Sequence, residues 1–244
     1  IIGDAVIAFN HTNVMLPLVT SKQAVKGAIT VGFPDYTKVA SSSVAEVADG
    51  VDEADVTSIT TAARNCTISE HVIRADITDL AVMGNADDLT GNVGQILGNA
   101  VAAKLDDDLV ELGKTFSQTE CGAGTALALD HVFGSMRQLR AAGAPFPYNL
   151  VLSPKQVWGA KGLSGLLVDP SAGAQADNPL SQAKLANGEV GKIAGFNVYW
   201  SDQIDEDVGS GGDAAGFAFS KGAVGLAIGS EGLIRIETER NASF

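Results

Sequence analysis

Residues 86–113, ADDLTGNVGQILGNAVAAKLDDDLVELG, form one continuous amphipathic pattern. Their apolar side chains recur every three or four residues, the spacing of one face of an α-helix. This stripe consists of Leu89, Val93, Ile96, Leu97, Ala100, Val101, Leu105, Leu109 and Leu112. The pattern predicts a single helix of about 40 Å, at about 1.5 Å per residue. Gly91, Gly94 and Gly98 weaken such a helix, so we expect another backbone to pack closely against it there.

Two segments before this helix have the composition of β-strands. Residues 28–40 and 56–63 are rich in β-branched side chains and flank the polar sequence SSSVAEVADGVDEAD at 41–55, which is too long for a tight turn. The sequence therefore predicts a long two-stranded arm. No aromatic residue lies between Thr37 and Thr115, so little in this half can pack beneath the arm. We expect a neighbouring molecule to order it; a flexible surface loop is the alternative.

The second half of the chain holds ten of the fourteen aromatic residues, so the self-sufficient core is expected there. The patterns predict a helix over 130–142, with Phe133, Met136 and Leu139 facing inward, and a strand over 149–152. Ser153 has the spacing of an N-cap, with Pro154 in the first turn and Gln156 completing a capping box. Further strands are predicted at 195–200, 223–228 and 233–240. Because strands and helices do not alternate regularly, the fold class is α+β.

Composition excludes several function classes. The formal charge of −13 repels a phosphate backbone, which argues against a dedicated nucleic-acid binder. Cys66 and Cys121 cannot build a disulfide framework, and the three histidines are spread too widely for structural zinc. No segment has the length of a membrane span, and the first residues lack a signal-peptide pattern, so we expect a protein that is neither membrane-bound nor secreted.

Motifs that carry chemistry are incomplete. Gly113-Lys114-Thr115 has the ending of a phosphate loop, but Asp108 stands where its first glycine is required, with Asp107 beside it. Ser153 and Cys121 are the candidate nucleophiles of a hydrolase, yet neither has a recognisable elbow or thiol-protease signature. Residues 106–108, three consecutive aspartates, are expected on a solvated face or against a neighbouring subunit. The acidic turn at 202–207 lacks the ligand spacing of an EF-hand. We therefore expect no catalytic residue, cofactor or metal site.

Four passages in their order resemble the major capsid protein of tailed double-stranded-DNA phages, the Hong Kong 97-type capsid fold. NVGQILGNAVAAKLDDDLVELG (92–113) is similar to its spine helix, and MRQLRAAGAPFPYNLVLSPKQVW (136–158) to its axial-domain helix, strand and Ser-Pro helix start. VGKIAGFNVYWSDQI (190–204) resembles its Gly-x-x-x-Gly-Phe-x-Val strand. AAGFAFSKGAVGLAIGSEGLIRIETERN (214–241) resembles the closing strands of its peripheral domain.

The resemblance implies a structural protein that is not an enzyme. It would assemble as hexamers and pentamers into an icosahedral shell in the virion, built in the host cytoplasm, enclosing double-stranded DNA without sequence-specific binding. Scaffolding, portal and decoration proteins are the further partners implied. On this mapping residues 1–27 are an N-terminal arm and 28–66 an extended loop; 67–125 with 222–244 form the peripheral domain, and 126–221 the axial domain.

The extended loop is the expected assembly interface, and its candidate residues are Lys38, Val44, Glu46, Val47, Asp49, Val51, Asp52, Glu53 and Arg64. Some relatives join subunits through a loop lysine and a peripheral-domain asparagine. Here Lys38 lies near the loop base and Asn241 is the acceptor by location, a departure that predicts a non-covalent shell. Two alternatives stay open: an encapsulin-type nanocompartment shell of the same fold, and a small hydrolase that uses Ser153 or Cys121.

Overall fold

The computed structural model describes residues 13–36, 39–44, 46–50, 57–78, 83–84, 89–159, 162–163, 191–207 and 212–235. The chain divides into two compact units. Unit 1 consists of Ile1–Thr20 and Val72–Val224, and unit 2 of Ser21–His71 and Gly225–Phe244. Both units therefore combine segments that are far apart in the sequence.

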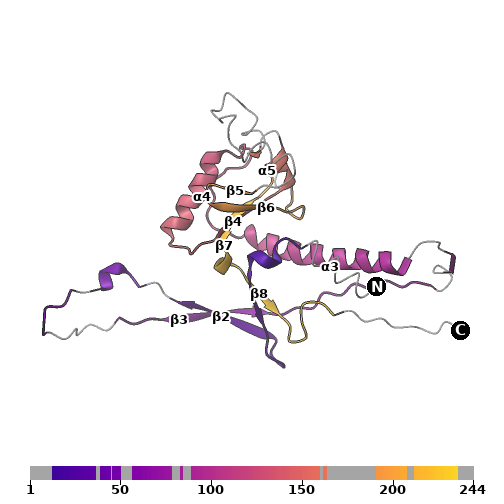
Figure 1. Ribbon diagram of the computed structural model, residues 1–244, viewed down its shortest axis with the longest axis horizontal. Coiled ribbons are helices and arrows are strands. Elements are labelled where there is room, and N and C mark those ends of the chain that lie inside the picture. Colours follow the sequence, from indigo (N-terminus) through magenta and orange to yellow (C-terminus); the bar gives the residue numbers. More distant parts are fainter. Residues whose placement is uncertain are drawn as a thin grey trace. The chain divides into compact units, whose positions relative to one another are not determined.

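Helices and strands alternate irregularly along the chain (Figure 1). Unit 1 contains η1 (Leu16–Leu18), α3 (Leu89–Gly113), α4 (Leu129–Ala141), β4 (Tyr148–Leu152), α5 (Pro154–Trp158), β5 (Lys192–Ile193), β6 (Phe196–Trp200), β7 (Phe217–Ser220) and η5 (Lys221–Ala223). Unit 2 contains β2 (Thr30–Tyr36), η2 (Ser41–Ser43), β3 (Thr61–Thr67) and β8 (Gly225–Ile228), and β1 (Thr20–Gln23) begins at the boundary between the units. The predicted α+β class is confirmed.

A four-stranded sheet of order β5-β6-β4-β7 forms the centre of unit 1. β4 pairs in parallel with β6, with Leu150 opposite Val198, and antiparallel with β7, with Val151 opposite Phe217. Every residue of β4 is buried. A strand buried on both faces needs cover on both sides, and helices supply it.

The first face of this sheet packs against α4 and α5. Its core contains Val132, Tyr148, Leu150, Leu152, Val157, Leu163, Phe196 and Val198, with Met136 and Leu139 packed against it. Ser153 and Gln156 form the predicted capping box: the Ser153 hydroxyl accepts a hydrogen bond from the Gln156 N–H, and the Gln156 side chain accepts one from the Ser153 N–H. The prediction for Phe133 is wrong, because 56% of Phe133 is exposed. Val132, one position earlier, turns into the core instead.

The second face of the sheet meets the C-terminal end of α3. Side chains alternate along a strand, so Asn149 and Val151 of β4 share this face with Phe217 and Phe219 of β7. The Phe217 ring stacks on Phe219 and meets Phe116 edge to face, with ring centroids 5.6 and 5.9 Å away. Phe217 also lies directly over Gly113, the last residue of α3.

Helix α3 forms where the periodicity predicts it, but a different face is buried. Ile96 is 65% exposed and Leu112 45% exposed, although both belong to the predicted apolar stripe. The buried positions are Gly91, Gly94, Gly98, Ala102, Asp106, Leu109, Val110 and Gly113. This buried face is richer in small side chains than the predicted stripe, and small side chains permit close approach of a neighbouring segment. The close packing expected at the three glycines agrees with their burial.

In unit 2, β2 and β3 form an antiparallel ribbon whose register places Val31 opposite Cys66 and Tyr36 opposite Thr61. The predicted two-stranded arm is thus confirmed, but its second strand is Thr61–Thr67 and not 56–63; residues 57–60 are exposed and outside any strand. Strand propensity depends on pairing and burial, and the ribbon buries Val31 while leaving the β-branched run before Thr61 in solvent. The predicted strand at 233–240 is not found over 233–235, and its remainder lies outside the described residues.

Candidate assembly interface

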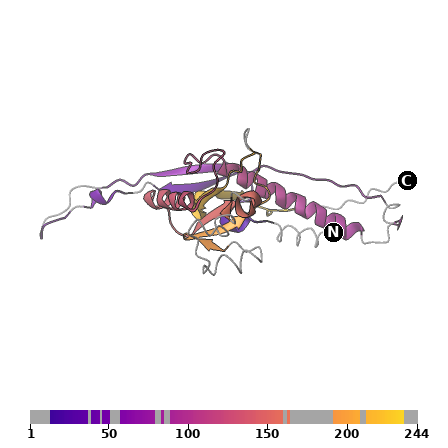
Figure 2. The same cartoon turned by 90° about the horizontal axis from the view of Figure 1, so that it is seen from above.

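The loop that joins β2 to β3 presents its side chains to solvent. Every described residue between the two strands is exposed, and these residues continue beyond the strands in Figures 1 and 2. The exposed apolar side chains include Val44 (79%) and Ile59 (63%), together with Val39, Val47 and Tyr36. The loop therefore exposes apolar side chains at several positions along its length.

The predicted interface residues fall into two groups. Val44, Glu46, Val47 and Asp49 are exposed on the loop, and Arg64 lies on β3. Arg64 Nε donates to Asp35 Oδ2 on β2 at 3.1 Å, and both side chains are largely in solvent. This ion pair connects the two strands and contributes little to stability because water screens it. Lys38, Val51, Asp52 and Glu53 lie outside the described residues.

The base of the ribbon is anchored to β8. Val31 is 4% exposed, and a Cβ at Gly225 would lie 3.0 Å from the Phe33 ring, so only a residue without a side chain fits there comfortably. β8 in turn pairs with β1. The ribbon is therefore held at its base, while the loop beyond Tyr36 projects into solvent.

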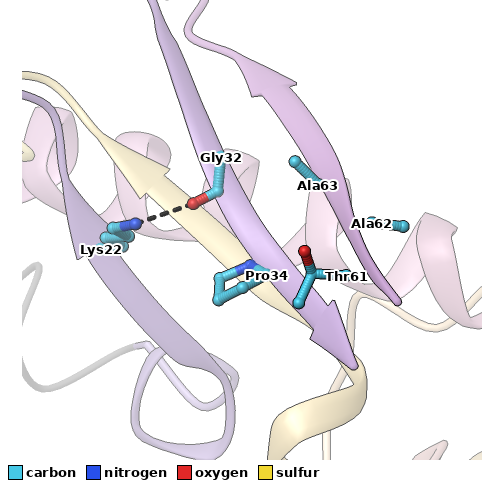
Figure 3. A pocket seen from close by; sticks show the side chains of 6 residues that line it. All are labelled: Lys22, Gly32, Pro34, Thr61, Ala62 and Ala63. Carbon is cyan, nitrogen blue, oxygen red and sulfur yellow. Dashed lines mark hydrogen bonds between the residues drawn. The ribbon is translucent and has the colours of Figure 1, made fainter. Parts of the chain in front are cut away.

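A shallow hollow of about 330 Å³ lies beside the ribbon, lined by Lys22, Gly32, Pro34, Thr61, Ala62 and Ala63 (Figure 3). Lys22 Nζ donates to the Gly32 carbonyl oxygen at 2.7 Å, so this carbonyl points away from β3. Residues two apart in a strand direct their backbone groups to the same edge, and Pro34, which lacks an N–H, therefore lies on that outer edge. The edge is protected against pairing with an additional strand.

Asp106 holds the start of unit 1 against α3. It is 3% exposed, and its carboxylate accepts hydrogen bonds from the backbone N–H groups of Val14 (2.8 Å) and Met15 (3.0 Å). The expectation of a solvated Asp106 is therefore wrong; spacing alone did not reveal that this aspartate lies on the buried glycine face. Asp107 and Asp108 do face outward, where they pair with Lys104. Burial raises the pKa of Asp106 above its ordinary value, and the two N–H donors oppose that shift.

Replacing Asp106 by Ala should lower the free energy of unfolding by about 2 kcal/mol, because the buried N–H of Met15 and the partly buried N–H of Val14 lose their acceptor. Urea denaturation measures this loss, with Asp107→Ala as the exposed control expected to change stability little.

The stability of the protein should also depend on pH through Asp106. Since the pKa of Asp106 is raised in the folded state, the folded protein binds a proton at Asp106 at a higher pH than the unfolded chain does. The stability of wild type relative to Asp106→Asn should therefore increase as pH falls through the folded-state pKa. Equal losses of stability in Asp106→Ala and Asp107→Ala would contradict the role of Asp106 as the acceptor for Val14 and Met15.

The candidate nucleophiles are not arranged for catalysis. Ser153 is fully buried, and its hydroxyl is engaged in the cap of α5. The Cys121 thiol lies within 4.0 Å of the carbonyl oxygens of Gly122, Thr125 and Ala126. Burial, and then Asp213, raises the pKa of Cys121, which disfavours the reactive thiolate. The Nε2 atom of His71 lies 3.5 Å from the hydroxyl oxygen of Ser69, which is neither of the candidate nucleophiles.

Among the residues that the structure describes, no group of three or more His, Cys, Asp or Glu side chains is arranged to hold a metal ion. Within the same residues, no helix is both long and apolar enough to cross a membrane.

Comparisons with known proteins identify the fold. No family model and no curated protein matches the sequence. A solved structure from Mycobacterium phage Che8 superposes with a TM-score of 0.62 at 16% identity, over 88% of this chain and 76% of that one. The asymmetric unit of the bacteriophage PhiM1 mature capsid superposes with a TM-score of 0.52 at 15% identity, over 81% of this chain and 65% of that one. The chain therefore has the α+β fold of these phage structures, which confirms its resemblance to phage capsid proteins.

Proposed function

We propose that this chain is a major capsid protein of the Hong Kong 97 type. It forms hexamers and pentamers that close into an icosahedral shell around the double-stranded DNA of a tailed phage. The observation that carries the proposal is its likeness in fold, over 81% of the chain, to a structure titled as a mature phage capsid. Scaffolding, portal and decoration proteins are the partners proposed beside other copies of the chain.

The exposed loop supports assembly into a shell. A two-stranded ribbon is marginally stable in water, and here its loop carries exposed valine and isoleucine side chains far beyond the anchored base. A neighbouring subunit would bury these groups. Because the loop of one copy would lie on a different surface of the next, the contact is heterologous, and repetition of such contacts closes a ring or shell.

The acidic composition fits enclosure of DNA without specific binding. At a net charge of −13, the chain offers little general attraction to phosphate groups. A closed wall confines DNA mechanically, so no DNA-binding site is needed on each subunit. The domain division that accompanies this proposal is an arm at 1–27, an extended loop at 28–66, a peripheral domain of 67–125 and 222–244, and an axial domain at 126–221.

Electron microscopy of the purified protein, with light scattering on the same sample, tests the proposal. Closed shells or capsomer rings are the expected result, and nuclease-protected DNA in shells recovered from infected cells identifies a virion. Shells that contain a cargo enzyme and no DNA would indicate an encapsulin. A monodisperse monomer or dimer under all assembly conditions would overturn the shell function and direct attention to Ser153 and Cys121.

The shell should be held together without covalent bonds between subunits. Lys38 is the sole lysine of the extended loop and lies near its base, so the loop tip has no amine for an isopeptide bond. Boiling assembled shells in SDS should give one band at the mass of a single subunit. A ladder of higher bands, with Lys38 joined to another peptide in the mass spectrum, would contradict this expectation.

A further inference from the structure

The outer surface of α4 is both apolar and cationic. Leu129 (40%) and Phe133 (56%) are exposed one turn apart, and Arg137 and Arg140 continue the same surface toward the end of the helix. Arg140 lies over the ring of Phe146 at 4.6 Å from its centroid, and Phe146 itself is 57% exposed. We call these five residues the α4 face. Two acidic residues lie next to it: Asp130 beside Leu129, and Glu120 beside Arg137.

These two arginines are available to a partner. Arg137 is 3.6 Å from Glu120, but 78% of its side chain is exposed, so the pair is weak. Arg140 is exposed, and its guanidinium lies over an aromatic ring, a contact that does not use its hydrogen-bond donors. Arginine and aromatic side chains are the residue types enriched at the centres of protein interfaces.

The opposite side of the same unit is acidic. α4 packs on the first face of the sheet β5-β6-β4-β7, whereas the end of α3 packs on the second, as Figure 1 also shows. Asp107 of α3 is half-exposed and pairs with Lys104 at 3.1 Å, and Asp202 and Asp205 are exposed on the turn after β6. Asp202 is close enough to α3 to raise the pKa of Asp106 in addition to burial, which is the main cause, and Asp205 is close enough to raise the pKa of Lys114 in addition to Glu111. We call Asp107, Asp202 and Asp205 the acidic face.

We propose that the α4 face of one subunit binds the acidic face of a second copy of this chain, side by side within a capsomer. The inference rests on the proposed shell function and specifies one of its contacts. Complementary charges on opposite sides of a single unit favour head-to-tail association, and rotation between successive copies closes this arrangement into a ring. The charge of the whole chain is negative, so a paired cationic and acidic face also overcomes the general repulsion between copies.

Charge reversal on each side tests the contact. R137E with R140E, and separately D107K with D202K, should each raise the protein concentration needed for ring formation by about tenfold or more, because like charges then face each other. Joining all four substitutions in one chain should restore rings, since the reversed charges attract again. Mass photometry at matched ionic strength gives the ring fraction, and thermal unfolding confirms that each variant is folded.

Net charge is controlled separately from position. K192E with K221E changes the charge by the same amount as R137E with R140E, at two exposed lysines outside the α4 face; this variant should form rings like wild type. D107K with D202K combined with K192E and K221E has the wild-type net charge and should not recover ring formation.

Rings that persist in R137E with R140E would overturn the contact and leave the shell function standing. A wild type that forms neither rings nor shells would overturn the shell function itself.

Discussion

Replacing residues 37–60 by Asn-Gly abolishes shell formation while both units stay folded: this is the largest effect that we expect. Tyr36 and Thr61 are already opposite each other in the ribbon, and Asn-Gly is a favoured two-residue hairpin turn that can connect them. The change removes the exposed valines and isoleucine of the loop but none of the buried contacts of Val31 or Phe33. Electron microscopy should show no closed shells, and circular dichroism should show a folded protein.

A pair of matched substitutions separates the apolar contacts of the loop from its length. V44D with V47D places two charges where apolar side chains would be covered, and burial of unpaired charge strongly opposes assembly. S41D with S43D adds the same charge at neighbouring exposed positions without removing an apolar side chain. The first variant should lose shells and the second should retain most of them. Equal behaviour of both would show that charge in general, and not burial of Val44 and Val47, controls assembly.

Replacing Gly113 by Ala should lower the free energy of unfolding by about 1–3 kcal/mol, as expected for overpacking. The added Cβ would lie 2.4 Å from Cδ1 of Phe217 and 2.6 Å from its Cγ, so the ring itself must move. Phe116 and Phe219 pack against the same ring and restrict that movement. The higher helix propensity of Ala offsets about 1 kcal/mol of the clash at most. Urea denaturation gives the difference in stability.

Gly222 provides the matched control for this substitution. A Cβ there meets no atom within 4 Å, so Gly222→Ala should leave stability nearly unchanged. Phe217→Leu alone should be destabilising, but it should reduce the additional loss caused by Gly113→Ala because the rigid ring is gone. If the two substitutions are additive, the clash with Phe217 does not explain the role of Gly113.

Local signals in the sequence predicted most of the elements of unit 1. Ser153, Pro154 and Gln156 determine the start of α5 through contacts within four residues, so their spacing sufficed to predict the cap. The three-and-four periodicity likewise located α3. The strand after the loop was misplaced by several residues because strand boundaries depend on the partner, here Val31 opposite Cys66, which lies far away in the sequence. Phe133 and Ile96 were misassigned to the core for a related reason: apolarity gives no information about which helix face a neighbour covers.

The sequence by itself determined the α+β class, the long helix, the capped turn at Ser153 and the projecting loop, since each depends on the preferences of adjacent residues. The tertiary structure alone decided the rest. It buried the glycine face of α3, placed Asp106 under Val14 and Met15, set Phe217 over Gly113 and put the arginines of α4 on the side of the sheet opposite Asp107. These features arise from close packing between segments separated by up to about a hundred residues, a distance over which local periodicity specifies neither partner nor face.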